Sequence, residues 1–220
     1  DHANLVDFFP VHTYPVLGSD PIETAFEKLG AVGAAMEELK ATMRRVAPAH
    51  VGKIPITFTE WNGGGHRAEL DLTSALWSAL WIGELFRHGV NSANQWDALS
   101  DSPEKGGFGW AQGSTPPRRK GQYWAFWLWS HRMGDALLTS SVTGTASLST
   151  VATRGKNAVQ VMLVNRDRGR PARAQVRLKG FPAGKAGRLS TLSAREYLWN
   201  AGEHRPQWSV EPPLAALATG

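Results

Sequence analysis

The pattern of apolar and polar positions in the first part of the chain changes between two periods. Residues 4–15 and 53–61 are short apolar runs of the kind that form buried strands. Between them, apolar residues recur every three or four positions over 22–46, which predicts a helix with one buried face. Asp20 is suited to cap the start of this helix, and Pro48 to end it.

The same succession of strand and helix continues along the chain. Residues 69–88 predict a second helix that Gly89 ends, 90–96 predict a third strand, and 120–133 predict a third helix. A glycine- and proline-rich loop, 99–118, separates the last two. Because strand and helix alternate three times, the pattern favours an α/β fold with parallel strands and crossover helices.

From residue 136 onward the pattern is one of short strands with turn residues between them. Residues 146–153, 158–166 and 172–179 are strand candidates, and in 172–179 alanine, valine and leucine alternate strictly with arginine, glutamine and lysine. We therefore expect two domains. Residues 1–135 are an α/β domain, and 136–220 are an antiparallel β-sandwich packed against it.

Charge and composition change at the same place. Residues 1–135 hold 12 lysines and arginines against 15 acidic residues and eight of the ten tryptophans, whereas 136–220 hold 12 against 4. The basic residues of the second part are spread along alternating strands and lack interleaved stacking aromatics, so a nucleic-acid partner is disfavoured. An anionic polysaccharide remains a second hypothesis for them.

Composition also excludes several kinds of chemistry. The chain has no cysteine, which removes disulfides, thiolate metal sites and cysteine nucleophiles. No apolar run is as long as a membrane span, so no membrane partner is expected. The histidines have no metal-ligand spacing, and we expect neither a metal nor a cofactor.

Polar and aromatic residues stand where each of the three predicted parallel strands ends. They are His12 and Tyr14, then Glu60, Trp61 and Asn62, then Trp96. In an eight-fold (β/α)₈ barrel the functional groups occupy these carboxyl-terminal strand ends. The glycines at 63–65 allow a bulky ligand to approach closely. A phosphate cradle is disfavoured because no Lys-Ser/Thr pair follows them.

These strand ends resemble a known group of enzymes. His-x-Tyr, Thr-Glu-Trp-Asn and the final tryptophan are similar to strands six, seven and eight of retaining glycoside hydrolases with two catalytic glutamates. The likeness is strongest to families thirty-nine, forty-four and fifty-one, which hold xylosidases, endoglucanases and arabinofuranosidases. The stretches "YWAFWLWSHRMGDALL" and "SVEPPLAALAT" resemble their last barrel helix and the closing strand of their accessory β-sandwich.

The resemblance assigns a role to each strand-end residue. Glu60 is implied to be the nucleophile of a retaining glycosidase, with a carbohydrate as the substrate. Tyr14 is implied to donate a hydrogen bond to its carboxylate, and His12 to orient it or bind a sugar hydroxyl. Trp96 is implied to be a stacking floor for the sugar. Trp61 and Asn62 are expected to contribute to substrate binding.

The second carboxylate of such a site is not evident. The family's acid/base follows an asparagine, and the sequence holds no Asn-Glu dipeptide. We expect an upstream part of the barrel to supply it, and Asp97 or Glu104 would be less favoured substitutes.

A chain of strands six to eight alone is then expected to aggregate or assemble with a partner that supplies the front of the barrel, and to be inactive. A non-catalytic carbohydrate-binding or structural fragment is the alternative. A secreted or periplasmic location is favoured over a cytoplasmic one.

Overall fold

The computed structural model describes residues 6–17, 19–63, 71–100, 108–113, 116–181 and 186–217. The elements of the first part are β1 (Phe9–Thr13), a 3-10 helix η2 (Ile22–Gly30), α1 (Ala31–Val46), a short η3 (Pro48–His50), β2 (Ile56–Trp61), α2 (Leu72–Arg87), β3 (Ser92–Gln95), β4 (Leu99–Ser100), β5 (Ala111–Gln112), β6 (Arg118–Arg119) and α3 (Gly121–Arg132). The later strands are β7 (Ala136–Leu138), β8 (Leu148–Arg154), β9 (Val159–Asn165), β10 (Gly187–Ser190), β11 (Tyr197–Asn200), β12 (Arg205–Ser209) and β13 (Leu214–Leu217).

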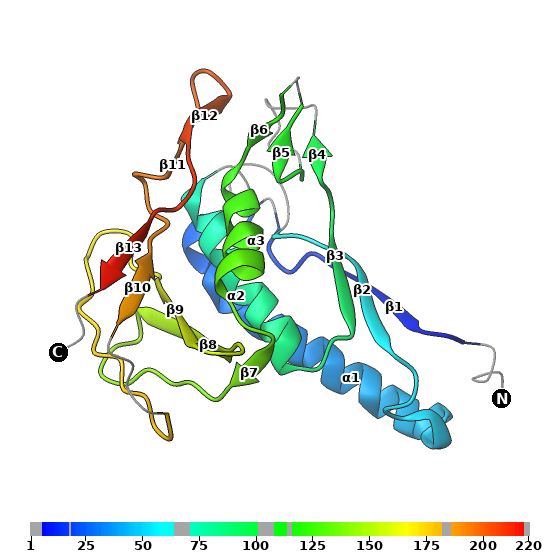
Figure 1. Ribbon diagram of the computed structural model, residues 1–220. Coiled ribbons are helices and arrows are strands. Elements are labelled where there is room, and N and C mark those ends of the chain that lie inside the picture. The colour runs from blue at the N-terminus through cyan, green and yellow to red at the C-terminus, as the bar shows by residue number, and fades with distance from the viewer. Residues whose placement is uncertain are drawn as a thin grey trace.

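A three-stranded parallel sheet organises the first part of the chain. Its order is β1-β2-β3, and both pairs of neighbours run parallel, as the succession of strand and helix predicts. The helices lie on one side of this sheet, and the sheets of the later strands lie beyond the helices (Figure 1). The other face of the sheet carries exposed residues, among them Pro10, His12, Ser92 and Asn94. The fold is therefore mixed α/β, with one open sheet face.

The helix expected over 22–46 forms in two pieces. Its first nine residues are a 3-10 helix that ends at Gly30, and the α-helix proper begins at Ala31. Asp20 was expected to cap the helix, but its carboxylate accepts a hydrogen bond from the backbone N–H of Leu17, so that expectation is wrong. The apolar face is otherwise as predicted, because Val32, Met36 and Met43 are buried. Val46, at the last turn, is 58% exposed.

The second helix begins and ends close to its expected residues. Asp71 is its N-cap and accepts a hydrogen bond from the N–H of Thr73 at 2.6 Å. Gly89 follows the helix with a φ of 71°, the left-handed conformation that a C′ glycine adopts. Burial raises the pKa of the Asp71 carboxyl above its ordinary value, against the lowering effect of the Thr73 hydrogen bonds and of Arg168. No helix within the described residues is long and apolar enough to cross a membrane.

One apolar core joins the sheet, the helices and part of the C-terminal region. Phe58 and Trp61 from β2 pack in it with Trp77 and Trp81 from α2, and Val151 from β8 belongs to the same cluster. The tryptophans at 77, 81 and 124, on α2 and α3, are at most 1% exposed. Burial of side chains this large is a main source of the stability of this part.

The loop over 99–118 contains structure that its composition does not predict. Strands β4, β5 and β6 form a small three-stranded sheet after the end of β3. The stretch 108–110 lies close against this sheet, since a Cβ at Gly109 would be 2.4 Å from the backbone N of Ser100. A glycine is therefore required at that position.

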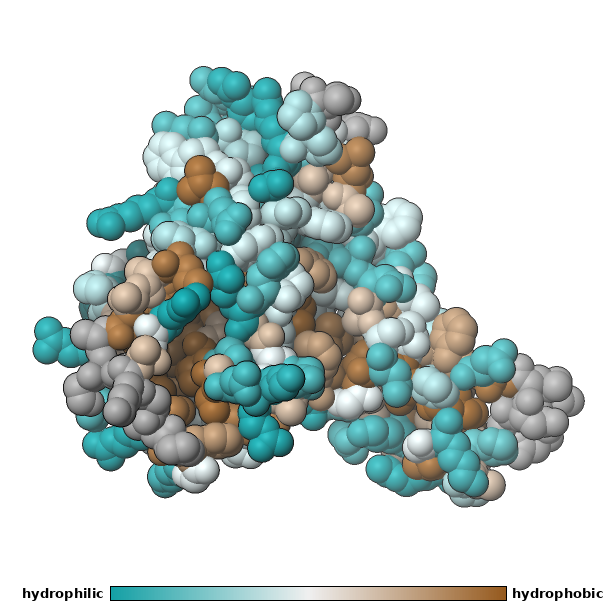
Figure 2. Space-filling view, in the orientation of Figure 1, coloured by the Kyte–Doolittle hydropathy of each residue, from teal (hydrophilic) through white to brown (hydrophobic). Residues whose placement is uncertain are grey.

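The C-terminal region is built from antiparallel strands in three small sheets. Their orders are β7-β8-β9, β10-β13 and β11-β12. Leucines of β9, β10 and β13 remain exposed, at 41% for Leu163, 49% for Leu189 and 47% for Leu217. Apolar residues gather around a hollow on the side of the molecule where β8, β9 and β10 lie (Figure 2).

The strand predicted over 172–179 is absent from the structure. These residues form no strand and all are exposed, with Val176 at 52% and Leu178 at 43%. Alternation predicts which face of a strand is buried, but a strand forms only where a sheet edge accepts its backbone hydrogen bonds. Two of the four inward positions are alanines, which offer little apolar area to hold the segment against a sheet.

The C-terminal region packs tightly on α2 and α3. A Cβ at Gly83 of α2 would lie 2.7 Å from a methyl carbon of Val151 in β8. Tyr197 of β11 is fully buried against Gly121 at the start of α3, and burial raises the pKa of its phenol. The indole N–H of Trp124 donates to the hydroxyl of Ser209 at 2.8 Å. The region is thus attached to the helices by buried contacts.

Candidate active site

A β-bulge in β2 turns Glu60 towards the open face of the sheet. Strict alternation would place Glu60 on the same face as Ile56 and Phe58, which point into the core. However, Val11 pairs with Phe58 whereas His12 pairs with Glu60, so β2 has one extra residue at this point. The register with β3 shifts at the same place. As a result Trp61 takes the buried side and Glu60 the open one.

The Glu60 carboxylate contacts two side chains from the end of β1. The Tyr14 hydroxyl donates a hydrogen bond to Oε2 at 2.9 Å. His12 Nδ1 lies 3.5 Å from the same oxygen. The side chains of Glu60 and His12 are 30% and 56% exposed, so the carboxylate is accessible from outside. The expected hydrogen bond between Tyr14 and Glu60 is thus present, and it fixes the direction of the carboxylate.

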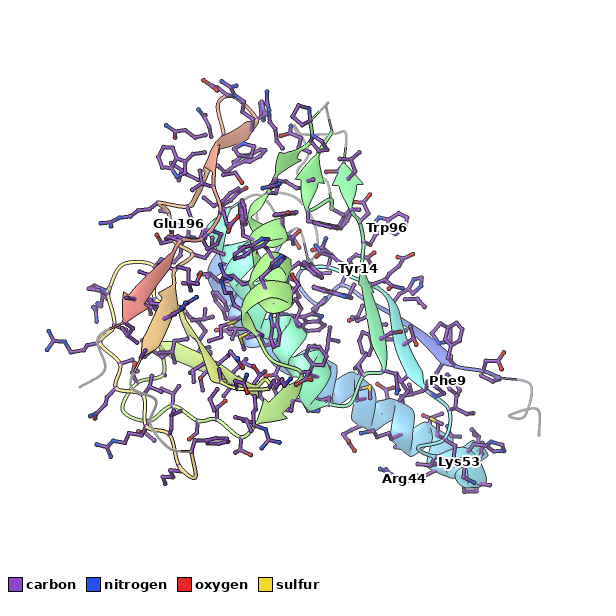
Figure 3. All side chains as sticks on the ribbon, in the orientation of Figure 1. Phe9, Tyr14, Arg44, Lys53, Trp96 and Glu196 are labelled. Carbon is purple, nitrogen blue, oxygen red and sulfur yellow. The ribbon has the colours of Figure 1, made fainter. Side chains whose placement is uncertain are left out.

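Trp96 stands at the end of the neighbouring strand. It is 49% exposed, and its backbone N–H donates to the Trp61 carbonyl at 2.9 Å. Tyr14 and Trp96 lie at the same end of the parallel sheet, whereas Phe9 and Lys53 lie towards the other end (Figure 3). An exposed indole at a strand end presents a flat apolar face on which a sugar ring can stack.

Trp61 is placed differently from the residues that face outward. It is 1% exposed and packs in the core against Trp77, Trp81 and Phe126, at ring-centroid distances of 6.0–6.3 Å. The structure therefore does not bring its side chain together with Glu60, Tyr14 and Trp96. The bulge explains this, because it sends the residue after Glu60 to the helix side of the sheet.

Asn62 is also fully buried, and its side chain joins the ends of neighbouring elements. Its Nδ2 donates to the Trp96 carbonyl at 2.6 Å and to the Phe108 carbonyl at 2.9 Å. Its Oδ1 accepts from the Gly63 N–H at 2.6 Å and from Gln122 at 2.9 Å. All four hydrogen-bonding positions of the carboxamide are occupied by protein groups. Asn62 thus links the end of β2 to the backbone of Trp96 and Phe108 and to α3 by buried hydrogen bonds.

Phe108 lies against Tyr14, the hydrogen-bond partner of Glu60. Its ring lies edge-on to the ring of Tyr14, with centroids 5.6 Å apart and planes at 71°. Sequence reasoning missed it because it stands in the glycine-rich loop, far from any strand pattern. The only available signal was that an aromatic residue is unusual in such a loop.

Two further expectations concern residues outside the described part of the chain. Glu104, one of the substitute acids, and Gly64 and Gly65 of the glycine run lie outside the described residues. Asp97 follows Trp96, and its backbone pairs with Phe108 and Trp110. Among the residues that the structure does describe, no group of three or more histidine and acidic side chains could hold a metal ion.

Comparison with known proteins finds similarity in structure only. No protein-family model matches the sequence, and no curated protein sequence does. Among solved structures, the GH51 α-L-arabinofuranosidase of Thermotoga petrophila is similar with a TM-score of 0.71 and 15% identity, over 97% of this chain and 49% of that one. A family 44 endoglucanase of a Clostridium is similar with a TM-score of 0.54 and 16% identity, over 74% and 35%.

A β-xylosidase of Caulobacter crescentus is also similar, with a TM-score of 0.50 and 18% identity, over 71% of this chain and 33% of that one. The resemblance to arabinofuranosidases, endoglucanases and xylosidases is thereby confirmed at the level of the fold, and it concerns the C-terminal part of those chains. The chain spans half or less of the length of these structures. At such identities the likeness establishes a shared fold, and the chemistry depends on the site itself.

Proposed function

We propose that the chain is the C-terminal part of a retaining glycoside hydrolase in which Glu60 is the nucleophile. The observation that carries the proposal is the Tyr14 hydroxyl 2.9 Å from the Glu60 carboxylate, at the carboxyl-terminal ends of two adjacent parallel strands. In this proposal β1, β2 and β3 are strands six, seven and eight of a (β/α)₈ barrel. Residues 136–220 are the accessory β-sandwich.

The chemistry divides between Glu60 and a second carboxyl group. Glu60 attacks the anomeric carbon and forms a covalent glycosyl-enzyme as the leaving oxygen takes a proton from the acid/base. Water, activated by the same acid/base, then cleaves the ester and frees Glu60. Tyr14 and His12 hold the carboxylate in the direction of attack. Trp96 offers its exposed indole face to the apolar face of the sugar.

The acid/base is proposed to come from the upstream part of the same barrel. Two features support this proposal. In the part of the chain that the structure describes, β1 and β3 each pair only with β2, so both edges of the parallel sheet are open. Parallel sheets are ordinarily covered on both faces and extended at their edges, and here one face is exposed as well. Strand five of a complete barrel would pair at the β1 edge.

The substrate class follows from the exposed tryptophan and the structural neighbours. Those neighbours are described as an arabinofuranosidase, an endoglucanase and a xylosidase. We propose that the substrate is an O-glycoside within a plant- or microbial-type polysaccharide or oligosaccharide. A secreted or periplasmic location suits such a polymer, which is too large to enter a cell intact.

A second candidate is a non-catalytic carbohydrate-binding or structural module. One observation favours it. Within the described residues, the polar partners of the Glu60 carboxylate are a tyrosine hydroxyl and a histidine ring, and no hydrogen bond joins it to the second carboxyl group that a retaining enzyme needs.

Replacement of Glu60 distinguishes the two candidates. In the protein that carries the whole barrel, Glu60→Gln should lower the turnover of aryl glycosides by about 10⁴-fold or more and leave the melting temperature unchanged, because it removes the nucleophile and keeps the shape. Glu203→Gln, on an exposed turn, is the matched control and should retain full activity. Wild-type turnover in Glu60→Gln would show that Glu60 is not the nucleophile.

A further inference from the structure

We propose that Phe108 is a positioning residue that fixes the direction of the Tyr14 hydroxyl on Glu60, and that the Asn62 carboxamide anchors Phe108. The catalytic part of this inference rests on the proposed function, whereas the positional part does not. It assigns a role to a loop residue that no strand pattern marks. It also gives the buried Asn62 a task other than contact with the substrate.

The first step is that Asn62 fixes the backbone of Phe108. Its Nδ2 has two hydrogens, and the carbonyls of Trp96 and Phe108 take one each. Carbonyl oxygens only accept hydrogen bonds, so the NH₂ group must face them and the amide cannot turn around. The Oδ1 side is held by Gly63 and Gln122. The carbonyl of Phe108 is thus tied to the end of β2 by a buried, fully satisfied group.

The second step is that the residues beside Phe108 are fixed as well. The N–H of Trp110 donates to the Asp97 carbonyl at 3.1 Å. The Trp110 ring stacks on Tyr123 and Phe126 of α3, with centroids 5.5 and 5.8 Å apart. The absence of a side chain at Gly109 allows this stretch to lie against β4. The Cα of Phe108 therefore has little freedom, and its ring projects from a rigid base.

The third step is the contact between the two rings. The Phe108 ring meets Tyr14 edge-on, at 71° and 5.6 Å, the arrangement that aromatic quadrupoles favour. The phenol O–H bond prefers to lie in the plane of its ring, so the orientation of that plane sets the direction in which the hydrogen points. With the Tyr14 ring held, the hydroxyl reaches Glu60 Oε2 at 2.9 Å. Without Phe108 the ring would sample other rotamers, and this hydrogen bond would be made only part of the time.

A double-mutant cycle in the complete enzyme tests the inference. Phe108→Leu removes the ring and should lower kcat about tenfold with KM changed less than about threefold, because ground-state sugar binding is not its task. In the Tyr14→Phe background the same change should lower kcat by less than about twofold, because its target is gone. Phe108→Tyr keeps the ring and should restore kcat. Trp208→Leu, on β12 and outside this stretch, is the control and should act by the same factor in both backgrounds.

A spectroscopic readout separates this inference from the proposed function. The protein is labelled at the phenol carbon of tyrosine, and the Tyr14 signal is assigned with Tyr14→Phe. Phe108→Leu should shift or broaden that signal, and Trp208→Leu should not. If no glycosidase activity is found but the signal responds, the proposed function fails and the positional role stands. An unchanged signal, or an equal loss of kcat from Phe108→Leu in both backgrounds, overturns the role of Phe108.

Discussion

The Tyr14 hydroxyl donates a 2.9 Å hydrogen bond to Glu60 Oε2 across 46 residues of sequence. The two residues meet because β1 and β2 are parallel neighbours, so their carboxyl-terminal ends lie at the same end of the sheet. The bulge at residues 59–60 of β2 completes the arrangement by turning the carboxylate to the open face.

Removal of this hydroxyl tests its contribution. Tyr14→Phe should lower kcat about 10- to 100-fold, since a hydrogen bond to a charged group is worth about 1.5–3 kcal/mol and a factor of ten corresponds to about 1.4 kcal/mol. KM should change little. The comparison is made with aryl glycosides on the complete enzyme, and Tyr123→Phe, on α3, is the control. A kcat within twofold of the wild type would show that the hydrogen bond has no catalytic weight.

Trp96 should act mainly on substrate binding. Trp96→Ala removes an indole that is 49% exposed at the strand end, and it should raise KM about tenfold with a smaller effect on kcat. Trp208→Ala, which removes an indole 38% exposed on β12, should leave KM unchanged. Steady-state kinetics on an oligosaccharide measure both. Equal effects of the two substitutions would remove the case for Trp96 as a stacking platform.

Several of these relationships could be predicted from the sequence, and others could not. The alternation in "ITFTEW" predicts β2 and its buried Ile56 and Phe58, but it also places Glu60 among them. The bulge that separates them depends on pairing with β1 and β3, which no single segment contains. Asn62 was expected to contribute to substrate binding because of the resemblance carried by Thr-Glu-Trp-Asn. Its burial is decided by partners 34, 46 and 60 residues away.

For 172–179 the sequence pattern predicts a strand, but the structure contains none there. Its alternation is stricter than that of β3, whose four residues hold a single apolar side chain, Ala93. β3 nevertheless forms, because β2 presents a free edge beside it, whereas no neighbouring strand accepts 172–179. Local pattern predicts the face of a strand, and the rest of the fold decides whether the strand exists.

Asn62 should matter more for stability than its size suggests. Asn62→Asp keeps the shape but removes both hydrogens that the carbonyls of Trp96 and Phe108 accept, and it places oxygen against oxygen. The unfolding free energy should fall by roughly 2–5 kcal/mol, the cost of unpaired buried polar groups. Chemical denaturation measures this. Asn157→Asp, at an exposed position, should change it by less than about 0.5 kcal/mol. Similar stabilities of the two variants would contradict the assigned contacts.

The raised pKa of the Asp71 carboxyl predicts that the stability of the fold depends on pH. Its pKa is raised in the folded chain above 3.8 by burial, so ionisation is harder in the folded state than in the unfolded one. Its contribution therefore favours folding below pH 3.8 and is lost as the pH rises through the higher folded pKa. Asn at this position keeps the helix cap without the charge. The melting temperature of Asp71→Asn relative to wild type should rise between about pH 3 and pH 7. A relative fall would mean that the Arg168 contact outweighs burial.

Direct capture of the reaction intermediate tests the central claim. A glycoside with a good leaving group, and with fluorine in place of the hydroxyl next to the anomeric carbon, should form the glycosyl-enzyme and then hydrolyse slowly, because fluorine disfavours the oxocarbenium-like transition state. The complete enzyme is treated with arabinofuranosyl, xylosyl and cellobiosyl forms, digested, and sequenced by mass spectrometry. We predict one added glycosyl group, on Glu60, and no label in Glu60→Gln. A label on another carboxylate, or turnover with inversion and no covalent adduct, would contradict the assignment of Glu60 as the nucleophile.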